Sequence, residues 1–264
     1  MYKTVLENHL FDRHFEINSN AEIKIEDWRF LGSVGMKIPL AAVDASLLTL
    51  GTNNGQPVEA MRAAVVVKQP DVCTQVIRLG PYLRVDDSSN EKMIQLENFA
   101  KRLALRQISG GIVLLDGCTL PHSQNSEEYI LGANLCNNLI ISIKKRLMMS
   151  SVLPDINDVK DKLVAKVKNE SSSYLLKIGN EPITLKADIY PHVNITDFAC
   201  ALSNLIKSDE IYMSYPNTLR LAHMYSKILP TETLAIQRIA LRKKGLVISP
   251  NISDRKVILG TMWS

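Results

Sequence analysis

A run of four apolar residues, Ile112 to Leu115, leads directly into the carboxylate of Asp116, and a turn at Gly117 follows. An unbroken apolar run of this length is typical of a strand that is buried on both faces of a sheet. Open α/β sheets bind their ligands in the crevice at the carboxyl ends of such strands. The sequence therefore predicts a core strand that presents Asp116 at a sheet edge facing a crevice.

A second stretch has the same form. Residues 39–43 are apolar, Asp44 follows them, and the small residues Ala45 and Ser46 come next. Either Asp alone could simply open a turn, as Asp often does. Two buried strands that both end in Asp favour a different interpretation, because a metal-dependent phosphoryl-transfer site needs carboxylates in this arrangement.

Length and composition fit a globular α/β protein. The chain has 264 residues, which suits one large domain or two small ones, and an apolar content of 46% excludes wholesale disorder. The net charge of +4 is compatible with a polyanionic partner but does not argue for one. The four cysteines have neither zinc-type spacing nor the look of a disulfide framework. With no apolar signal core and no membrane-spanning run, we expect a cytoplasmic protein.

We expect a single domain, with an N-terminal arm or helix over residues 1–35, a core over about 36–230, and a C-terminal helix and tail over 231–264. The strands predicted from apolar runs are 39–44, 63–68, 76–79, 112–116, 139–144, 174–178 and 183–190. The helices predicted from helical spacing are 88–107, 127–137, 148–169, 196–207, 218–228 and 231–245. Turn residues at 49–57 and at Gly179-Asn180 predict hairpins. The end of the tail, 256–263, could add an edge strand.

Two helical residues have side chains suited to a metal site. Glu97 borders the apolar stripe of its helix, and His223 shares a stripe with Leu219, Ala222 and Tyr225. Each has an ordinary alternative: Glu97 could form a surface ion pair with Lys101, one turn later, and His223 could be a packed core histidine.

Polar residues on the predicted strands, and one in a loop, are weaker candidates. Lys144 closes the strand 139–144 and could supply positive charge to a phosphate, or could merely extend its ammonium group to solvent. Asp188 lies on a strand of alternating apolar and polar residues, where it could simply be an exposed side chain with no catalytic role. His122 follows a proline in a loop, where solvation is the more ordinary state.

These candidates together suit a hard divalent cation. Mg²⁺ and Mn²⁺ prefer oxygen ligands in an octahedral array, and Mn²⁺ also accepts imidazole. Two such ions about 4 Å apart could clamp a phosphodiester during hydrolysis. The chain has no glycine-rich phosphate loop of the Walker type, which disfavours an ATPase, and no Gly-x-Ser-x-Gly nucleophile elbow.

Five short stretches, in the same order along the chain, resemble the NurA family of nucleases. They are Ala42-Val-Asp-Ala-Ser46, Gln95-Leu-Glu-Asn-Phe-Ala100, Val113-Leu-Leu-Asp-Gly-Cys-Thr-Leu120, Ile141-Ser-Ile-Lys144 and Tyr215-Pro-Asn-Thr-Leu-Arg-Leu-Ala-His223. The chain departs from the family at Ala45, where Gly is common, and at Cys118, where Ser is usual. It is also short for the family, which bears on accessory elements and dimer contacts.

The resemblance implies a ribonuclease H-like fold, a mixed sheet flanked by helices. It also implies a manganese-dependent DNA nuclease, with Mg²⁺ as an alternative ion. Such an enzyme degrades DNA in the 5′-to-3′ direction as a homodimer, and acts in end resection with the hexameric HerA helicase-translocase. The residues that it places in the catalytic site are Asp44, Glu97, Asp116, Lys144, Tyr215 and His223. By this resemblance the three acids would bind the metal ion, and His223 would be a further ligand or a proton-transfer group. Lys144 and Tyr215 would lie near the phosphate.

Two other functions remain open at the level of sequence. The short chain and the altered residues would also fit a non-catalytic adaptor that keeps the fold and binds a DNA-translocating ATPase. A ribonuclease H-like enzyme that acts on RNA or on a DNA junction is the third.

Overall fold

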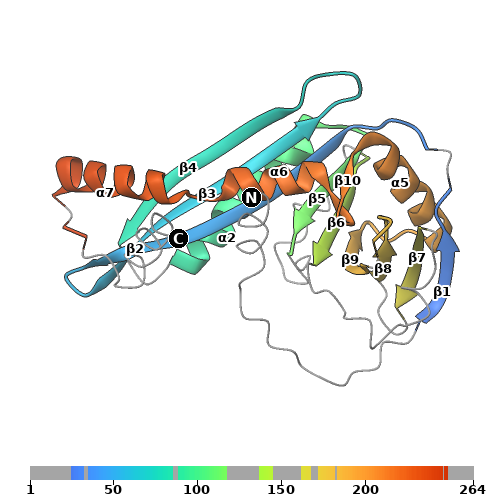
Figure 1. Ribbon diagram of the computed structural model, residues 1–264, viewed down its shortest axis with the longest axis horizontal. Coiled ribbons are helices and arrows are strands. Elements are labelled where there is room, and N and C mark those ends of the chain that lie inside the picture. The colour runs from blue at the N-terminus through green and yellow to red at the C-terminus, as the bar shows by residue number, and fades with distance from the viewer. Residues whose placement is uncertain are drawn as a thin grey trace, which may run out of the picture.

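The computed structural model describes residues 25–32, 35–85, 89–117, 137–144, 162–167, 172–181, 183–245 and 247–248. Within these residues, nine strands form one mixed sheet in the order β1-β7-β8-β9-β6-β5-β2-β3-β4 (Figure 1). Its strands are β1 (Ile25–Phe30), β2 (Leu40–Asn53), β3 (Gln56–Lys68), β4 (Gln75–Val85), β5 (Ile112–Asp116), β6 (Leu139–Lys144), β7 (Leu163–Val167), β8 (Ser173–Lys177) and β9 (Leu185–Tyr190). The helices are α2 (Ser89–Gln107), α5 (Ile195–Ser208), α6 (Asn217–Ser226) and α7 (Pro230–Lys244). A small hairpin of β10 (Ile211–Tyr212) and β11 (Tyr215–Pro216) precedes α6.

The centre of the sheet is parallel and its flanks are antiparallel. Strand β5 runs parallel to β2 on one side and to β6 on the other. Strands β2, β3 and β4 form a long antiparallel meander that extends away from this centre (Figure 1). The turn between β2 and β3 has positive φ at both Asn54 and Gly55, the conformation in which an Asn-Gly pair matches the twist of a hairpin.

Helices cover the two faces of the sheet, and alternation along the strands fixes which residues meet them. On β2 and β5, Ala42 and Leu114 belong to the core beneath α5 and α6. The next residues along these strands, Val43 and Leu115, belong to the core beneath α2 on the opposite face. Side chains two residues apart in a strand share a face, so residues 44 and 116 lie on the side of α6.

The predicted fold class is confirmed as a mixed α/β sheet flanked by helices, and its ribonuclease H-like type stays a prediction. The strands predicted at 112–116, 139–144, 174–178 and 183–190 are present within about two residues, as are four helices: α2, α5, α6 and α7. The predicted hairpins are also formed, since β2 pairs with β3 and β8 pairs with β9. Gly245 ends α7 in the left-handed conformation that glycine adopts without strain.

Several elements differ from the prediction. Residues 25–30 form an edge strand that pairs with β7, where we expected an arm or a helix, and residues 163–167 of the expected lysine-rich helix are that partner strand. Both segments are short, so pairing across the sheet outweighs their weak helical spacing. Strands β2 and β4 are much longer than predicted.

The rest of the expected N-terminal arm before residue 25, the helix over 127–136, the edge strand over 256–263, and His122, Cys118 and Cys136 lie outside the described residues. Among the helices that the structure does describe, none is both long enough and apolar enough to cross a bilayer.

Helix α7 lies along the long strands on the side of α6 (Figure 1). Ile236 packs against Leu50, Val58 and Ala60. The buried Arg62 of β3 holds the start of the helix through two contacts with Glu232, at 2.9 and 3.1 Å, and Arg78 of β4 reaches the same carboxylate at 3.0 Å. Through these ion pairs, Glu232 attaches the start of α7 to strands β3 and β4 of the meander.

The Glu232 contacts predict a pH-dependent stability. Hydrogen bonding from Arg62 is the largest influence, and with the Leu229 N–H and the charges of Arg62 and Arg78 it lowers the pKa of Glu232 from 4.5 to about 2, although burial opposes the shift. A lowered carboxyl pKa stabilises the fold fully above pH 4.5, and this stabilisation is lost as the pH falls towards 2. Urea unfolding of the wild type and of Glu232→Gln across this range should show the difference in free energy of unfolding shrinking as the pH falls. A difference that stays constant with pH would contradict this.

Candidate metal centre

Two aspartates lie side by side where strand β5 ends. Asp116 is the last residue of β5, and the register Val43↔Leu115 places Asp44 next to it on the parallel strand β2. The prediction that Asp44 ends its strand is wrong, because β2 continues for nine residues to Asn53. The two aspartates therefore lie where β5 ends, beside a β2 strand that continues past this point.

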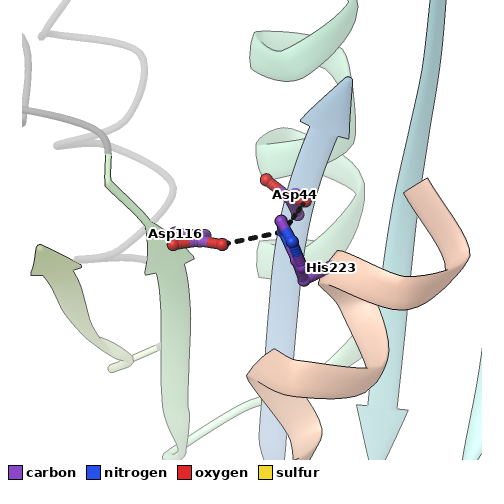
Figure 2. A group of neighbouring side chains, drawn as sticks. All are labelled: Asp44, Asp116 and His223. Carbon is purple, nitrogen blue, oxygen red and sulfur yellow. Dashed lines mark hydrogen bonds and ion pairs between the residues drawn. The ribbon is translucent and has the colours of Figure 1, made fainter. Parts of the chain in front are cut away.

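Helix α6 brings His223 to both carboxylates. Its Nδ1 lies 2.9 Å from Asp44 Oδ2 and 3.1 Å from Asp116 Oδ2. Figure 2 shows the imidazole pointing between the two aspartates, which come from neighbouring strands. A ring nitrogen that faces two carboxylate oxygens must carry a proton, because its lone pair would be repelled. The ring nitrogen is thus satisfied by two carboxylates, and whether His223 is a metal ligand or a packed histidine stays a prediction.

The N-terminus of α6 is fixed by a buried aspartate. Asp209 has a fully buried side chain, and its Oδ2 accepts a hydrogen bond from the backbone N–H of Thr218 at 2.8 Å. Its Oδ1 accepts from Lys68 Nζ at 3.2 Å and from the N–H of Glu210 at 3.0 Å. Pro216, the residue that precedes the helix, supplies no side-chain cap, so Asp209 takes that role from outside the helix.

The C-terminus of α6 is fixed to strands β2 and β3. The Ser46 hydroxyl of β2 donates to the backbone carbonyl of Ser226 at 2.5 Å. Arg62 of β3 donates to the carbonyl of Lys227 at 2.9 Å. These bonds satisfy carbonyls that a helix end leaves without partners. Because α6 is held at both ends, His223 has a fixed position over the two aspartates.

The donor atoms fit a divalent cation. One ligand atom from each of Asp44, Asp116 and His223 lies within 4.8 Å of the others. The three side chains are only 11%, 8% and 21% exposed, so the carboxylates are little screened by water. Two carboxylates this close repel each other unless a positive charge lies between them. Two carboxylates and an imidazole form a set that Mn²⁺ accepts, and Mg²⁺ would rely on the oxygens.

Tyr215 borders the same centre from β11. Its hydroxyl is buried. Burial, followed by the charge of Asp116, a hydrogen bond to Asp116 and the charge of Asp44, raises the pKa of Tyr215 well above 10. The phenol therefore stays protonated at neutral pH, beside the charge of Asp116. The expectation that Tyr215 lies near a phosphate stays a prediction.

Glu97 does not join this group. Helix α2 packs on the face of the sheet opposite α6, through Ala100 and Ala104. Glu97 Oε1 pairs there with Lys101 Nζ at 2.7 Å, which is the ion pair that its spacing allows. A role for Glu97 as a metal ligand therefore remains a prediction that requires a change of partner.

Lys144 and Asp188 form a separate pair. Lys144 Nζ lies 2.6 Å from Asp188 Oδ2, and the Ser173 hydroxyl also donates to Asp188. On β6, Ile143 belongs to the core under α6, so alternation turns Lys144 to the other face. The structure thus places Lys144 away from the side of Asp116 and gives Asp188 a charged partner of its own.

Sequence reasoning overlooked the residues that hold α6. Ser46 and Ser226 are two and three residues after Asp44 and His223, spacings that keep them on the same face of a strand and of a helix. These spacings could have identified both serines as neighbours of the predicted site residues. Arg62 gave none, because its contact with Lys227 joins distant segments, and Asp209 gave none, because its bond to Thr218, nine residues later, follows neither a helical nor a strand spacing.

No protein-family model matches the chain, and no curated protein matches it. Solved structures give distant likenesses. The Argonaute of Aquifex aeolicus matches over 82% of this chain and 30% of its own, at 13% identity and a TM-score of 0.39. Endonuclease V of Streptomyces avermitilis matches over 83% and 89%, at 13% identity and a TM-score of 0.40. The catalytic domain of human endonuclease V matches over 76% and 83%, at 13% identity and a TM-score of 0.43. At these identities and scores, the likenesses do not bear on the activity.

The anchoring of α6 predicts a stability effect at Asp209. Asp209→Ala leaves the buried N–H of Thr218 without an acceptor, which should lower the free energy of unfolding by about 2 kcal/mol in urea titrations. Asp209→Asn keeps an acceptor oxygen and should lose less. Asp71→Asn is the control, since Asp71 is exposed and pairs only with Lys37 among the described residues. An Asp209→Ala variant as stable as that control would contradict the assigned role.

Proposed function

We propose that the chain is a metal-dependent nuclease that hydrolyses phosphodiester bonds in DNA. The observation that carries this proposal is the convergence of Asp44, Asp116 and His223 from three separate elements within 4.8 Å. Strand-end carboxylates of a mixed α/β sheet are well suited to hold Mn²⁺ or Mg²⁺ against a phosphate. The ordered resemblance to NurA nucleases supports DNA as the substrate and Mn²⁺ as the ion.

Each residue has a distinct role in this proposal. A bound Mn²⁺ or Mg²⁺ supplies Lewis acidity and a more acidic water. Asp44 and Asp116 would hold the ion, with the protonated phenol of Tyr215 beside Asp116. His223 either completes the ligand set or transfers a proton at Nδ1, the atom that faces both carboxylates.

The finer assignments follow the resemblance alone. They are 5′-to-3′ degradation, a homodimer, and action with a HerA-type ATPase. The roles of Glu97 as a further ligand and of Lys144 near the phosphate also follow the resemblance alone, because the structure pairs these side chains with Lys101 and Asp188 on the other face of the sheet.

The decisive experiment is cleavage of labelled single- and double-stranded DNA by the purified chain, with Mn²⁺, Mg²⁺ or EDTA. Removing a ligand forfeits several kcal/mol of transition-state stabilisation, so Asp116→Ala should lower Mn²⁺-dependent cleavage by roughly 10³-fold or more. Asp71→Asn, which alters an exposed carboxylate remote from the centre in sequence, should cleave as the wild type does.

Cleavage that persists unchanged in Asp116→Ala would contradict the site. A wild type that cleaves no DNA with either ion, yet is retained by a HerA-type ATPase, would contradict the enzymatic proposal and indicate the adaptor instead. Cleavage confined to RNA would correct the substrate and leave the site intact.

A further inference from the structure

The Ser226 hydroxyl contacts Asp44, one of the three residues of the proposed metal centre. Ser226 is fully buried at the end of α6, and its Oγ lies 2.6 Å from Asp44 Oδ2. The same Oγ lies 2.9 Å from the backbone carbonyl of His223, one turn earlier in the helix. A hydroxyl has one proton, so it can donate to only one of these two oxygens. The carboxylate is charged and nearer, and charge-assisted hydrogen bonds are about twice as strong as neutral ones. The proton therefore goes to Asp44.

The position of this hydroxyl is itself fixed. Ser46, two residues after Asp44 on β2, donates to the backbone carbonyl of Ser226. The guanidinium of Arg62 holds the next carbonyl, that of Lys227. Strand β2 and the end of α6 are thus joined by two reciprocal serine contacts. These contacts keep the end of α6, and with it Ser226, in a fixed position beside Asp44.

We propose that Ser226 is a positioning residue that holds the carboxylate of Asp44 in the orientation that binds the metal ion. This inference rests on the proposed metal centre. Asp44 Oδ2 accepts from Ser226 and faces His223 Nδ1, whereas the structure gives Oδ1 no partner among the described residues. Oδ1 is therefore the oxygen that Asp44 offers to a cation. Without Ser226, the contact with His223 Nδ1 would be the remaining restraint, among the described residues, on rotation of the carboxylate about its Cβ–Cγ bond.

Partners that orient a metal ligand typically contribute 10- to 100-fold to metal affinity. Ser226→Ala should therefore weaken Mn²⁺ binding by 10- to 100-fold, measured on the full chain by calorimetry or by the electron paramagnetic resonance signal of free Mn²⁺. The metal alone is the probe, so the readout does not depend on cleavage. Saturating Mn²⁺ should then restore the cleavage rate of the variant to within a few-fold of the wild type.

Ser203→Ala is the matched control. Ser203 is a buried serine on α5 whose hydroxyl donates to the carbonyl of Ala199, four residues earlier, so its removal deletes a comparable helical hydrogen bond away from the centre. It should bind Mn²⁺ within about two-fold of the wild type. Urea unfolding of all three proteins ensures that affinities are compared between fully folded chains.

The outcomes separate this inference from the proposed function. If Ser226→Ala binds Mn²⁺ as tightly as the wild type, or if Ser203→Ala weakens binding equally, the positioning role is wrong. If Ser226→Ala alone weakens binding but the wild type cleaves no nucleic acid, the inference stands and the nuclease proposal fails. A wild type that binds no divalent cation overturns both.

Discussion

The imidazole of His223 lies between the carboxylates of Asp44 and Asp116. The contacts at both ends of α6 hold it in that position. Asp44 and Asp116 come from adjacent parallel strands whose register leaves their side chains next to each other on one face. Burial of both side chains strengthens their repulsion, because little water screens them. Helix α6 places the Nδ1 of His223 within 2.9 and 3.1 Å of an oxygen of each carboxylate.

The position of α6 depends on polar anchors as much as on its apolar face. Leu219 and Ala222 bury the helix in the core, but apolar contacts alone do not fix the rotation of a helix of ten residues. Asp209 at its start, and Ser46 with Arg62 at its end, fix both the rotation and the level of the helix along β2. Arg62 also binds Glu232, so the same side chain ties α7 to the end of α6. The centre is thus supported by the long meander, whose strands supply each of these anchors except Asp209 and Glu232.

Part of the fold could be predicted from the sequence because β5, β6, β8 and β9 are short apolar runs with clear ends, unlike the long strands of the meander. Asp116 was recognisable as a strand-end carboxylate, and Asp44 as its counterpart, although β2 runs on past it. The helical spacing correctly placed His223 on the same side of its helix as Leu219 and Ala222. That spacing could not show whether this side meets apolar side chains or carboxylates. Glu97 and Lys144 illustrate the opposite case. Their spacing within one element could not show that the sheet separates them from Asp116. The face on which a helix packs depends on the whole topology of the sheet, and so does the face to which a strand-end side chain turns.

The central claim is that Asp44, Asp116 and His223 share one cation. The most direct test is a crystal of the full chain soaked in Mn²⁺, with the ion located by its anomalous scattering. The account predicts one peak within coordination distance of an oxygen of each aspartate and of the His223 ring, with Asp44 contributing Oδ1. A peak elsewhere, or an unchanged contact between His223 Nδ1 and both carboxylates at saturating Mn²⁺, would show that the three residues form a structural hydrogen-bond cluster and not a metal site.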